Sequence, residues 1–264
     1  MVFTLNKNKM KVIALVYDYD LGKLSNIGRK WANNVYKNKD YIFEYSAACF
    51  ATFVDKNPKQ ILHLYTDDID LIKSKLSKYN ISWQRIIFWD YNERLKKYGD
   101  LDYSFRVAFE FIQENQSKEE YTIKIDNDMI FLGELPQIPN DSKDVLVWKY
   151  EHFVDSGNPL WGEKKACQYG IGETKFPVYN MGLMGLPTTF QSDEAHETMI
   201  KLINVDISDV TDVGSKIYHV CDQTAWNWIF HKYKYNVIQT YNIVKHHFEV
   251  KGNCIGDAEY LLKK

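Results

Sequence analysis

The sequence has few cysteines and no excess of charge of either sign, and each absence excludes a class of protein. The four cysteines form no Cys-x-x-Cys pair, which excludes a zinc site of that type and the dense disulfide framework of small secreted domains. Lys and Arg total 33 against 35 Asp and Glu, for a formal net charge of -2. A chain with this balance has no general attraction for a polyanion, so nucleic acid is excluded as the main partner.

Long apolar runs are also missing. The stretch before Asp18 has only about six consecutive apolar residues, too few for the apolar segment of a signal peptide and far too few to span a bilayer. We therefore expect a cytoplasmic protein, in which any contact with a membrane is peripheral.

What the chain does have is material for a core. Hydrophobic residues make up 45% and aromatic residues 15% of its 264 residues, which excludes the disordered and fibrous classes. The length lies within the range of one large α/β domain, and the composition shows no break. We expect residues 1–264 to form a single domain.

Apolar runs alternate with segments of helical periodicity in the first half of the chain. Strands and helices that alternate at this spacing predict an α/β fold with a mostly parallel central sheet flanked by helices, and with ligands at the carboxyl ends of its strands. The predicted strands are 11–17, 61–65, 83–89 and 121–125, and the predicted helices are 44–54, 68–79 and 103–113.

The second half has a weaker pattern. A strand is predicted at 144–150, an irregular stretch at 151–178, a strand at 179–186, a helix at 223–233 and one or two strands at 235–248. Because long irregular stretches are often functional, we expect 151–178 to lie beside the site and to close over it.

A short acidic motif stands out by its context. Asp-x-Asp begins at Asp18, Asp68, Asp100 and Asp126, against roughly two occurrences expected by chance. Only the last lies between two apolar runs, in YTIKIDNDMIFL. Carboxylates at such a strand end are tolerated if they are paired or bound to metal. Asp126 and Asp128, one residue apart in a turn, can hold a hard cation while a diphosphate completes its coordination.

This segment resembles the strand and metal-binding turn of glycosyltransferases with the GT-A fold. Further segments, in the same order, resemble members of glycosyltransferase family 8, such as glycogenin and bacterial lipopolysaccharide galactosyltransferases. They are ILHLYTDDID, YSFRVAFEF, YNMGLMG, CDQTAWN and KHHFEVKG. The resemblance implies one GT-A domain, with a nucleotide-binding part at about 10–135 and an acceptor-binding part at about 136–264.

The resemblance also assigns roles in binding the donor sugar. It implies that Arg106 approaches the diphosphate or the sugar, and that Asn180 and Gly182 contact the sugar. Asp222 and Gln223 match a segment that lies against the same sugar, so Arg106, Asp222 and Gln223 are the candidate catalytic residues. Each match also has a plain structural alternative, such as a helix cap or a surface ion pair.

The nucleotide is expected at the first strand and at the acidic turn. Tyr17 and Asp18 lie where the resemblance places the base, so Tyr17 would stack on uracil and Asp18 would accept from its N3–H. An ordinary strand-end loop is the alternative. Asp126, Asn127 and Asp128 would bind the nucleotide sugar, the two carboxylates through the metal.

The closing segment KHHFEVKG implies a third metal ligand and a phosphate contact. His247, which precedes Phe248, is the expected ligand, with His246 as its rival, and Lys251 is the expected phosphate contact. A neutral imidazole beside two carboxylates suits Mn²⁺ or Mg²⁺. A lysine near the diphosphate stabilises the leaving group as a point charge.

The predicted function is metal-dependent transfer of a sugar from a nucleotide-sugar donor, expected to be a UDP-sugar, to a hydroxyl of a glycan or glycoconjugate. The family 8 resemblance implies retention of the anomeric configuration. Two alternatives remain. VIALVYDYDLG resembles the nucleophile motif of haloacid-dehalogenase-type phosphatases, with Asp18 as nucleophile and Asp20 as acid or base. A non-catalytic protein would bind a sugar nucleotide in the same pocket.

Overall fold

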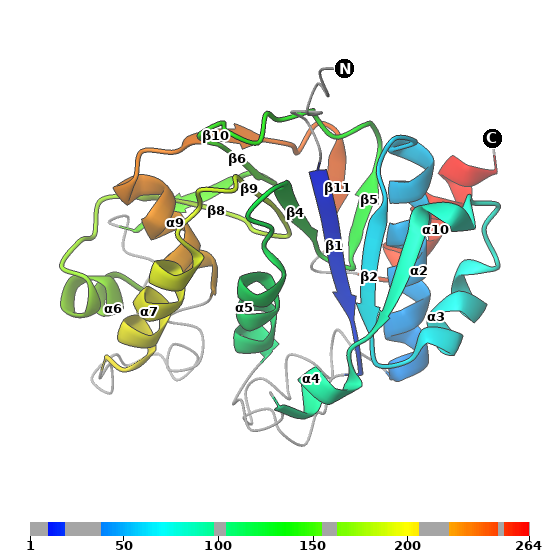
Figure 1. Cartoon of the computed structure of the whole chain (residues 1–264), viewed down its shortest axis with the longest axis horizontal. Helices are drawn as coiled ribbons and strands as arrows, with labels where there is room; N and C mark the ends of the chain where they lie inside the picture. Colours follow the sequence, from blue (N-terminus) through cyan, green and yellow to red (C-terminus); the bar gives the residue numbers. More distant parts are fainter. Residues whose placement is uncertain are drawn as a thin grey trace, which may run out of the picture.

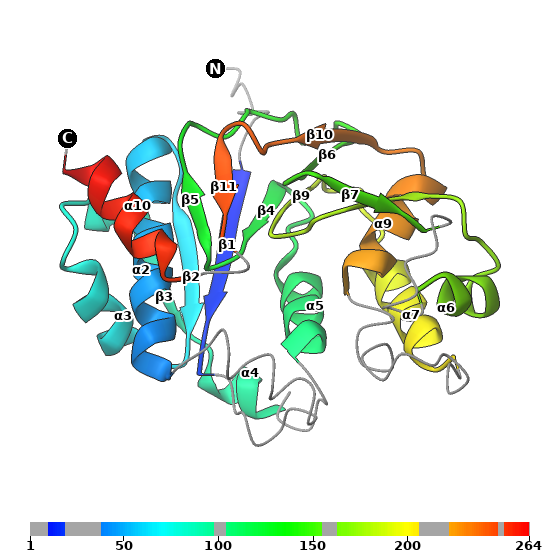
Figure 2. The ribbon, with the colours of Figure 1, turned by 180° about the vertical axis from the view of Figure 1, so that it is seen from behind.

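The computed structural model of the chain describes residues 10–18, 38–97, 104–154, 163–205, 222–247 and 251–263. Over these residues it is an α/β fold built on a seven-stranded sheet, in the order β10-β6-β9-β4-β1-β2-β3. Figure 1 shows α2, α3 and α10 gathered at one end of the molecule and α6, α7 and α9 at the other, with α5 between them. Figure 2 shows the same arrangement from behind. No described helix is both long enough and apolar enough to cross a membrane.

The first half of the chain has the predicted alternation of strands and helices. Neighbouring strands among β1 to β4 are all parallel, which confirms the predicted mostly parallel sheet. The predicted strand 83–89 instead begins with a short 3-10 helix, Trp83–Arg85. The strands are β1 (Met10–Val16), β2 (Leu62–Thr66), β3 (Ile86–Asp90) and β4 (Tyr121–Ile125), and the helices are α2 (Lys39–Lys56), α3 (Ile69–Leu76), α4 (Asn92–Lys97) and α5 (Ser104–Asn115).

The apolar run of β1 is explained by two cores, one on each face of the sheet. Successive side chains of a strand point to opposite faces. Val12 and Ala14 accordingly pack in the core formed with α2, whereas Ile13 packs in the core formed with α5. A strand buried on both faces presents apolar residues to both cores, which is why β1 is continuously apolar from Val12 to Val16.

The second half adds three strands to the sheet and several elements beside it. β9 is antiparallel to both β4 and β6, and β10 is parallel to β6. The strands are β6 (Asp144–Val147), β7 (Tyr150–Phe153), β8 (Pro177–Tyr179), β9 (Leu183–Leu186) and β10 (Asn236–Gln239), and the helices are α6 (Glu163–Gly170), α7 (Ser192–Ile203), α9 (Asp222–Lys232) and α10 (Asn253–Leu262).

The expectation of irregular structure at 151–178 is wrong for the residues that the structure describes there. The stretch contains most of β7, all of α6 and most of β8, and β7 pairs with β8 in a two-stranded sheet. These elements have three to eight residues, which is shorter than the window over which periodicity identifies a helix. Residues 155–162 lie outside the described part of the chain, and the predicted closure of this stretch stays a prediction.

A separate antiparallel ribbon follows the acidic turn. It consists of β5 (Met129–Phe131) and β11 (Val244–His246). The ribbon is joined to α2 by Thr52, whose hydroxyl accepts a hydrogen bond from the Phe131 amide (3.1 Å) and donates one to the carbonyl of Cys49 (2.8 Å). The ribbon and α2 share one core, so this hydrogen bond holds the strand after the acidic turn in place.

We predict that Thr52→Val lowers the free energy of unfolding by about 1–3 kcal/mol, because it leaves the buried Phe131 amide without an acceptor while it keeps the side-chain volume. Urea denaturation followed by circular dichroism measures the change. The exposed Thr189 provides the control, because Thr189→Val is expected to change stability by at most about 0.5 kcal/mol. Equal midpoints for the two variants would contradict the role given to Thr52.

Candidate metal centre

The acidic turn lies between β4 and β5, where the central sheet ends. The Asp126 amide donates to the Gly182 carbonyl (2.7 Å), so the turn continues the pairing of β4 with β9. The two carboxylates differ in burial: the Asp126 side chain is 36% exposed and that of Asp128 is 3% exposed. The predicted pair therefore has one carboxylate open to a ligand and one enclosed by protein. Asn127, between them, is buried.

The β5–β11 ribbon brings a histidine to this turn. His246 pairs with Met129, the first residue after the turn, and the His247 amide donates to the Asp128 carbonyl (2.9 Å). Ligand atoms of Asp126, Asp128 and His246 all lie within 4.8 Å of one another. The Trp148 ring meets the His246 ring edge-on, with centroids 5.0 Å apart, and holds its orientation.

The structure brings His246, and not the expected His247, to the carboxylates. Neighbouring residues of a strand point to opposite sides, so only one histidine of the pair can face the turn. The His247 ring lies on the other side, with Nε2 2.9 Å from a carboxylate oxygen of Asp257 in α10. The expectation that His247 is the metal ligand is therefore wrong, and His246 takes its place as the candidate ligand. Burial lowers the pKa of His247, with the hydrogen bond to Asp257 acting against it.

The arrangement of these atoms fits a divalent cation. Oδ1 of Asp128 is buried and accepts no hydrogen bond from the described residues. It lies 3.0 Å from Nε2 of His246. Two ligands at about 2.1 Å from an octahedral cation and at adjacent positions are themselves about 3.0 Å apart. Carboxylate oxygens with one imidazole nitrogen are a donor set suited to Mn²⁺.

Two lysines contact the same carboxylates. Lys251 forms an ion pair with Asp128, and Lys124 forms one with Asp126. Burial of Asp128 acts to raise its pKa, but the interactions with His246 and Lys251 outweigh burial and hold the pKa well below its usual value. Asp128 is therefore a carboxylate at neutral pH, which is the form that binds metal. Lys251, the expected phosphate contact, thus lies beside the candidate metal ligands. The contact of Lys124 with Asp126 was not predicted from the sequence.

The segment Asn180 to Gly182 forms one wall of the site. The Asn180 side chain accepts from the Gly182 amide (2.9 Å), and the Met181 amide donates to the side chain of Gln223 (3.3 Å). Gly182 is needed because of the histidine: a Cβ at this position would lie 2.7 Å from Cε1 of His246. The structure thus joins three predicted site residues to the metal cluster.

Glu151 of β7 is a site residue that the sequence did not indicate. Its carboxylate accepts a hydrogen bond from the Asn180 side chain (2.7 Å) and another from the Gln223 side chain (2.7 Å). It orients both side-chain amides that the resemblance assigns to the sugar. Glu151 belongs to no recognisable motif, and the pairing of β7 with β8 that places it was not predicted.

A second hydrogen-bonded group includes the residues that follow Glu151 and Gln223 in the sequence, and it supports the wall that Glu151 and Gln223 form with Asn180. Nε2 of His152 lies 2.5 Å from the Glu163 carboxylate, which also accepts from the Thr224 hydroxyl (2.6 Å). The hydrogen bond to Glu163 raises the pKa of His152 above its usual value. The group connects β7, α6 and α9, so it fixes the strand that carries Glu151 to the helix that carries Gln223.

The remaining predicted residues are only partly described. Tyr17 and Asp18 follow β1, whose neighbour β4 leads to the acidic turn, and the Asp18 amide donates to the Asp67 carboxylate (3.0 Å). They lie at the carboxyl end of β1, where the base is expected, and their contact with a base stays a prediction. The side chains of Arg106 and Asp222, and the whole of Asp20, lie outside the described part of the chain.

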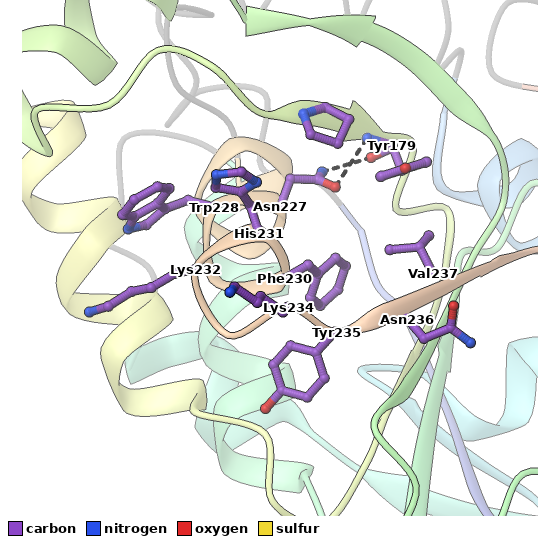
Figure 3. A pocket seen from close by; sticks show the side chains of 11 residues that line it. Tyr179, Asn227, Trp228, Phe230, His231, Lys232, Lys234, Tyr235, Asn236 and Val237 are labelled. Atoms are coloured by element: carbon purple, nitrogen blue, oxygen red, sulfur yellow. Dashed lines mark hydrogen bonds between the residues drawn. The ribbon is translucent and has the colours of Figure 1, made fainter.

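A cavity of about 590 Å³ lies apart from the metal cluster, between β8, α9 and β10. Figure 3 shows its lining, which includes none of the predicted site residues. One lining residue nevertheless serves the site. The Asn227 side chain accepts from the Tyr179 amide (3.1 Å) and donates to the Tyr179 carbonyl (2.9 Å), and so holds the residue before Asn180.

We predict that Gly182→Ala reduces the affinity for Mn²⁺ in the presence of UDP by roughly 10–100-fold, because the new methyl group displaces the His246 ring. Titration of Mn²⁺ followed by the electron paramagnetic resonance signal of the free ion measures the change. The control is Gly256→Ala in α10, where an added Cβ meets no atom within 4 Å. A folded Gly182→Ala protein with the wild-type affinity would show that His246 is not a ligand.

Comparisons with known proteins give a structural match only. No model of a protein family matches the sequence, and no curated protein matches it. Among solved structures, the chain is similar to the galactosyltransferase LgtC in complex with donor and acceptor sugar analogues. The TM-score is 0.50 at 10% sequence identity, and the match covers 84% of this chain and 70% of that chain.

A likeness at this identity establishes a fold. The match confirms the predicted fold class, an α/β GT-A fold with a mostly parallel central sheet flanked by helices. The GT-A fold and an Asp126, Asp128 and His246 group able to hold a divalent cation are thus found in the same chain.

Proposed function

We propose that this protein is a metal-dependent glycosyltransferase that uses a nucleotide-sugar donor, a UDP-sugar by the resemblance of its motifs to family 8, and a hydroxyl acceptor on a glycan or glycoconjugate. The observation that carries the proposal is the Asp126, Asp128 and His246 group at the end of the central sheet in a GT-A fold. Retention of the anomeric configuration is part of the proposal and rests on the same resemblance.

One group of residues would bind the metal and the diphosphate, and another would bind the sugar. Asp126, Asp128 and His246 would hold Mn²⁺ or Mg²⁺, which supplies positive charge to the departing nucleotide diphosphate. Lys251, already beside Asp128, would donate to a phosphate oxygen of the same leaving group. These groups stabilise charge that develops as the bond to the sugar breaks, which is the form of stabilisation that accelerates transfer.

The sugar would lie against the wall formed by Asn180 and Gln223. Glu151 holds both side-chain amides by hydrogen bonds of 2.7 Å, so their remaining N–H and carbonyl groups have fixed directions. Fixed donors and acceptors select the arrangement of sugar hydroxyls and orient the anomeric carbon, which lowers the entropic cost of reaching the transition state. Arg106 and Asp222 complete this wall in the proposal.

The best single substitution to test the proposal is Asp126→Asn. Asp128→Ala would leave the buried charge of Lys251 without its partner, and such a change destabilises a fold by itself. Asp126 is more exposed, and Asn at this position keeps a side-chain oxygen that accepts from the Lys124 ammonium, so we expect this substitution to disturb folding less than Asp128→Ala.

We predict that UDP with Mn²⁺ raises the thermal midpoint of the wild type more than either does alone, because the metal and the diphosphate bind the native state together. A ligand that binds only the native state stabilises it by about 2.7 kcal/mol at a concentration of 100 times Kd. Asp126→Asn should lose this joint shift. The control is Asp55→Asn at the end of α2, where the side chain is 43% exposed and paired with Lys56. An undiminished joint shift in Asp126→Asn would contradict the metal site.

Activity is then measured as release of UDP from a panel of UDP-sugars with and without acceptor glycans. Release that requires Mn²⁺ and intact Asp126 supports the transferase. A joint shift without turnover on any donor and acceptor would favour the non-catalytic alternative. Hydrolysis of a generic phosphomonoester without any response to nucleotides would favour the phosphatase alternative.

A further inference from the structure

Lys124 is a charged residue in the middle of the central sheet that the proposed function does not use. It lies on β4, two residues before Asp126, and pairs with Ile13 of β1 on one side and with Met184 of β9 on the other. Only 8% of its surface is exposed. A lysine is seldom this buried unless it is paired, so its presence here calls for a specific partner.

The partner is the metal site itself. The Lys124 ammonium forms an ion pair with the Asp126 carboxylate, and it lies 3.4 Å from the Met181 carbonyl oxygen, to which it donates. Lys251 forms the corresponding ion pair with Asp128. Two carboxylates therefore face two ammonium groups, and the charges of these four side chains balance before any cation binds.

The two lysines are both buried but differ in the elements that carry them. The backbone of Lys124 is fixed by strand pairing on both sides, and its side chain is buried. Lys251 lies outside the sheet, two residues before α10 begins. Lys251 is therefore placed to pair with a bound diphosphate, as proposed above, whereas the neighbouring strands hold Lys124 beside Asp126.

We propose that Lys124 is a built-in counter-ion that keeps the affinity of the site for a divalent cation low until a diphosphate binds, an inference that rests on the proposed function. A cation added to a balanced, largely buried cluster meets a fixed positive charge at short range, and this repulsion is only weakly screened. A nucleotide diphosphate brings the negative charge that the cluster lacks. Its binding removes the obstacle to the cation.

The coupling works in both directions. If the diphosphate raises the affinity for the cation, then the cation raises the affinity for the diphosphate by the same factor. The cation would enter and leave together with the nucleotide and would not remain in the site between turnovers. Lys124 thus makes the site specific for the complex of metal and diphosphate over either component alone.

The test is binding of Mn²⁺ to the purified full-length chain, with and without UDP, measured from the electron paramagnetic resonance signal of the free ion. The wild type is expected to bind Mn²⁺ weakly alone and about tenfold or more tightly with UDP. Lys124→Met, which keeps the length of the side chain and removes its charge, is expected to bind Mn²⁺ alone about tenfold or more tightly than the wild type. The effect of UDP on this variant should shrink accordingly.

The matched control is Lys11→Met on the neighbouring strand β1. The Lys11 ammonium donates to the backbone carbonyl of Asn115 (3.0 Å), which is not part of the cluster. This control should behave as the wild type does. Lys124→Gln, which also removes the charge but keeps a hydrogen-bond donor for Asp126, replaces Lys124→Met if thermal unfolding shows that the latter is not folded.

The outcomes separate the inference from the function. Tighter binding of Mn²⁺ alone in a Lys124 variant, but not in Lys11→Met, supports the counter-ion. UDP-dependent binding of Mn²⁺ in all proteins, with no gain for the Lys124 variants in the absence of UDP, overturns the counter-ion and leaves the transferase site standing. No binding of Mn²⁺ to the wild type even with UDP overturns the proposed function and the inference with it.

Discussion

The pairing of β11 with β5 is the constraint on which the candidate site depends. β5 begins directly after Asp128, so a strand that pairs with it is carried to the acidic turn. The register places His246 opposite Met129 and turns its ring toward the carboxylates. It also sends His247 to the other side, against Asp257. Thr52 and the shared core with α2 keep the ribbon in place, so the fold supports the metal ligands through backbone pairing and core packing.

The burial of Asp128 explains why lysines lie beside the two carboxylates. Asp128 is nearly inaccessible to solvent, and a buried carboxylate must be paired or bound to metal. The chain supplies Lys251 to Asp128 and Lys124 to Asp126, so the cluster is balanced by its own residues. A cation and a diphosphate can enter this cluster together without leaving an excess of charge. The wall formed by Asn180, Gly182 and Gln223 around Glu151 is joined to the same place, because the Asp126 amide donates to the Gly182 carbonyl.

Much of this arrangement could be predicted from the sequence, and the part that could not has a physical cause. The aromatic and β-branched residues of Tyr121–Ile125 predicted strand 121–125 correctly, and Asp126 and Asp128 were located directly after it. The choice between His246 and His247 could not be made, because it depends on pairing between β5 and β11, which are more than one hundred residues apart in the chain. Glu151 gave no signal, since its role comes from the unforeseen strand pair β7 and β8.

Joint binding of a divalent cation and the nucleotide diphosphate by Asp126, Asp128 and His246 is the property on which the proposed function depends. Crystals grown with Mn²⁺ and UDP, and measured at a wavelength where manganese scatters anomalously, test it directly. One anomalous peak is expected at about 2.1–2.2 Å from oxygens of both carboxylates and from Nε2 of His246, beside the diphosphate. A peak at His247 and Asp257, or a bound UDP with no peak beside it, would contradict this assignment of the metal ligands.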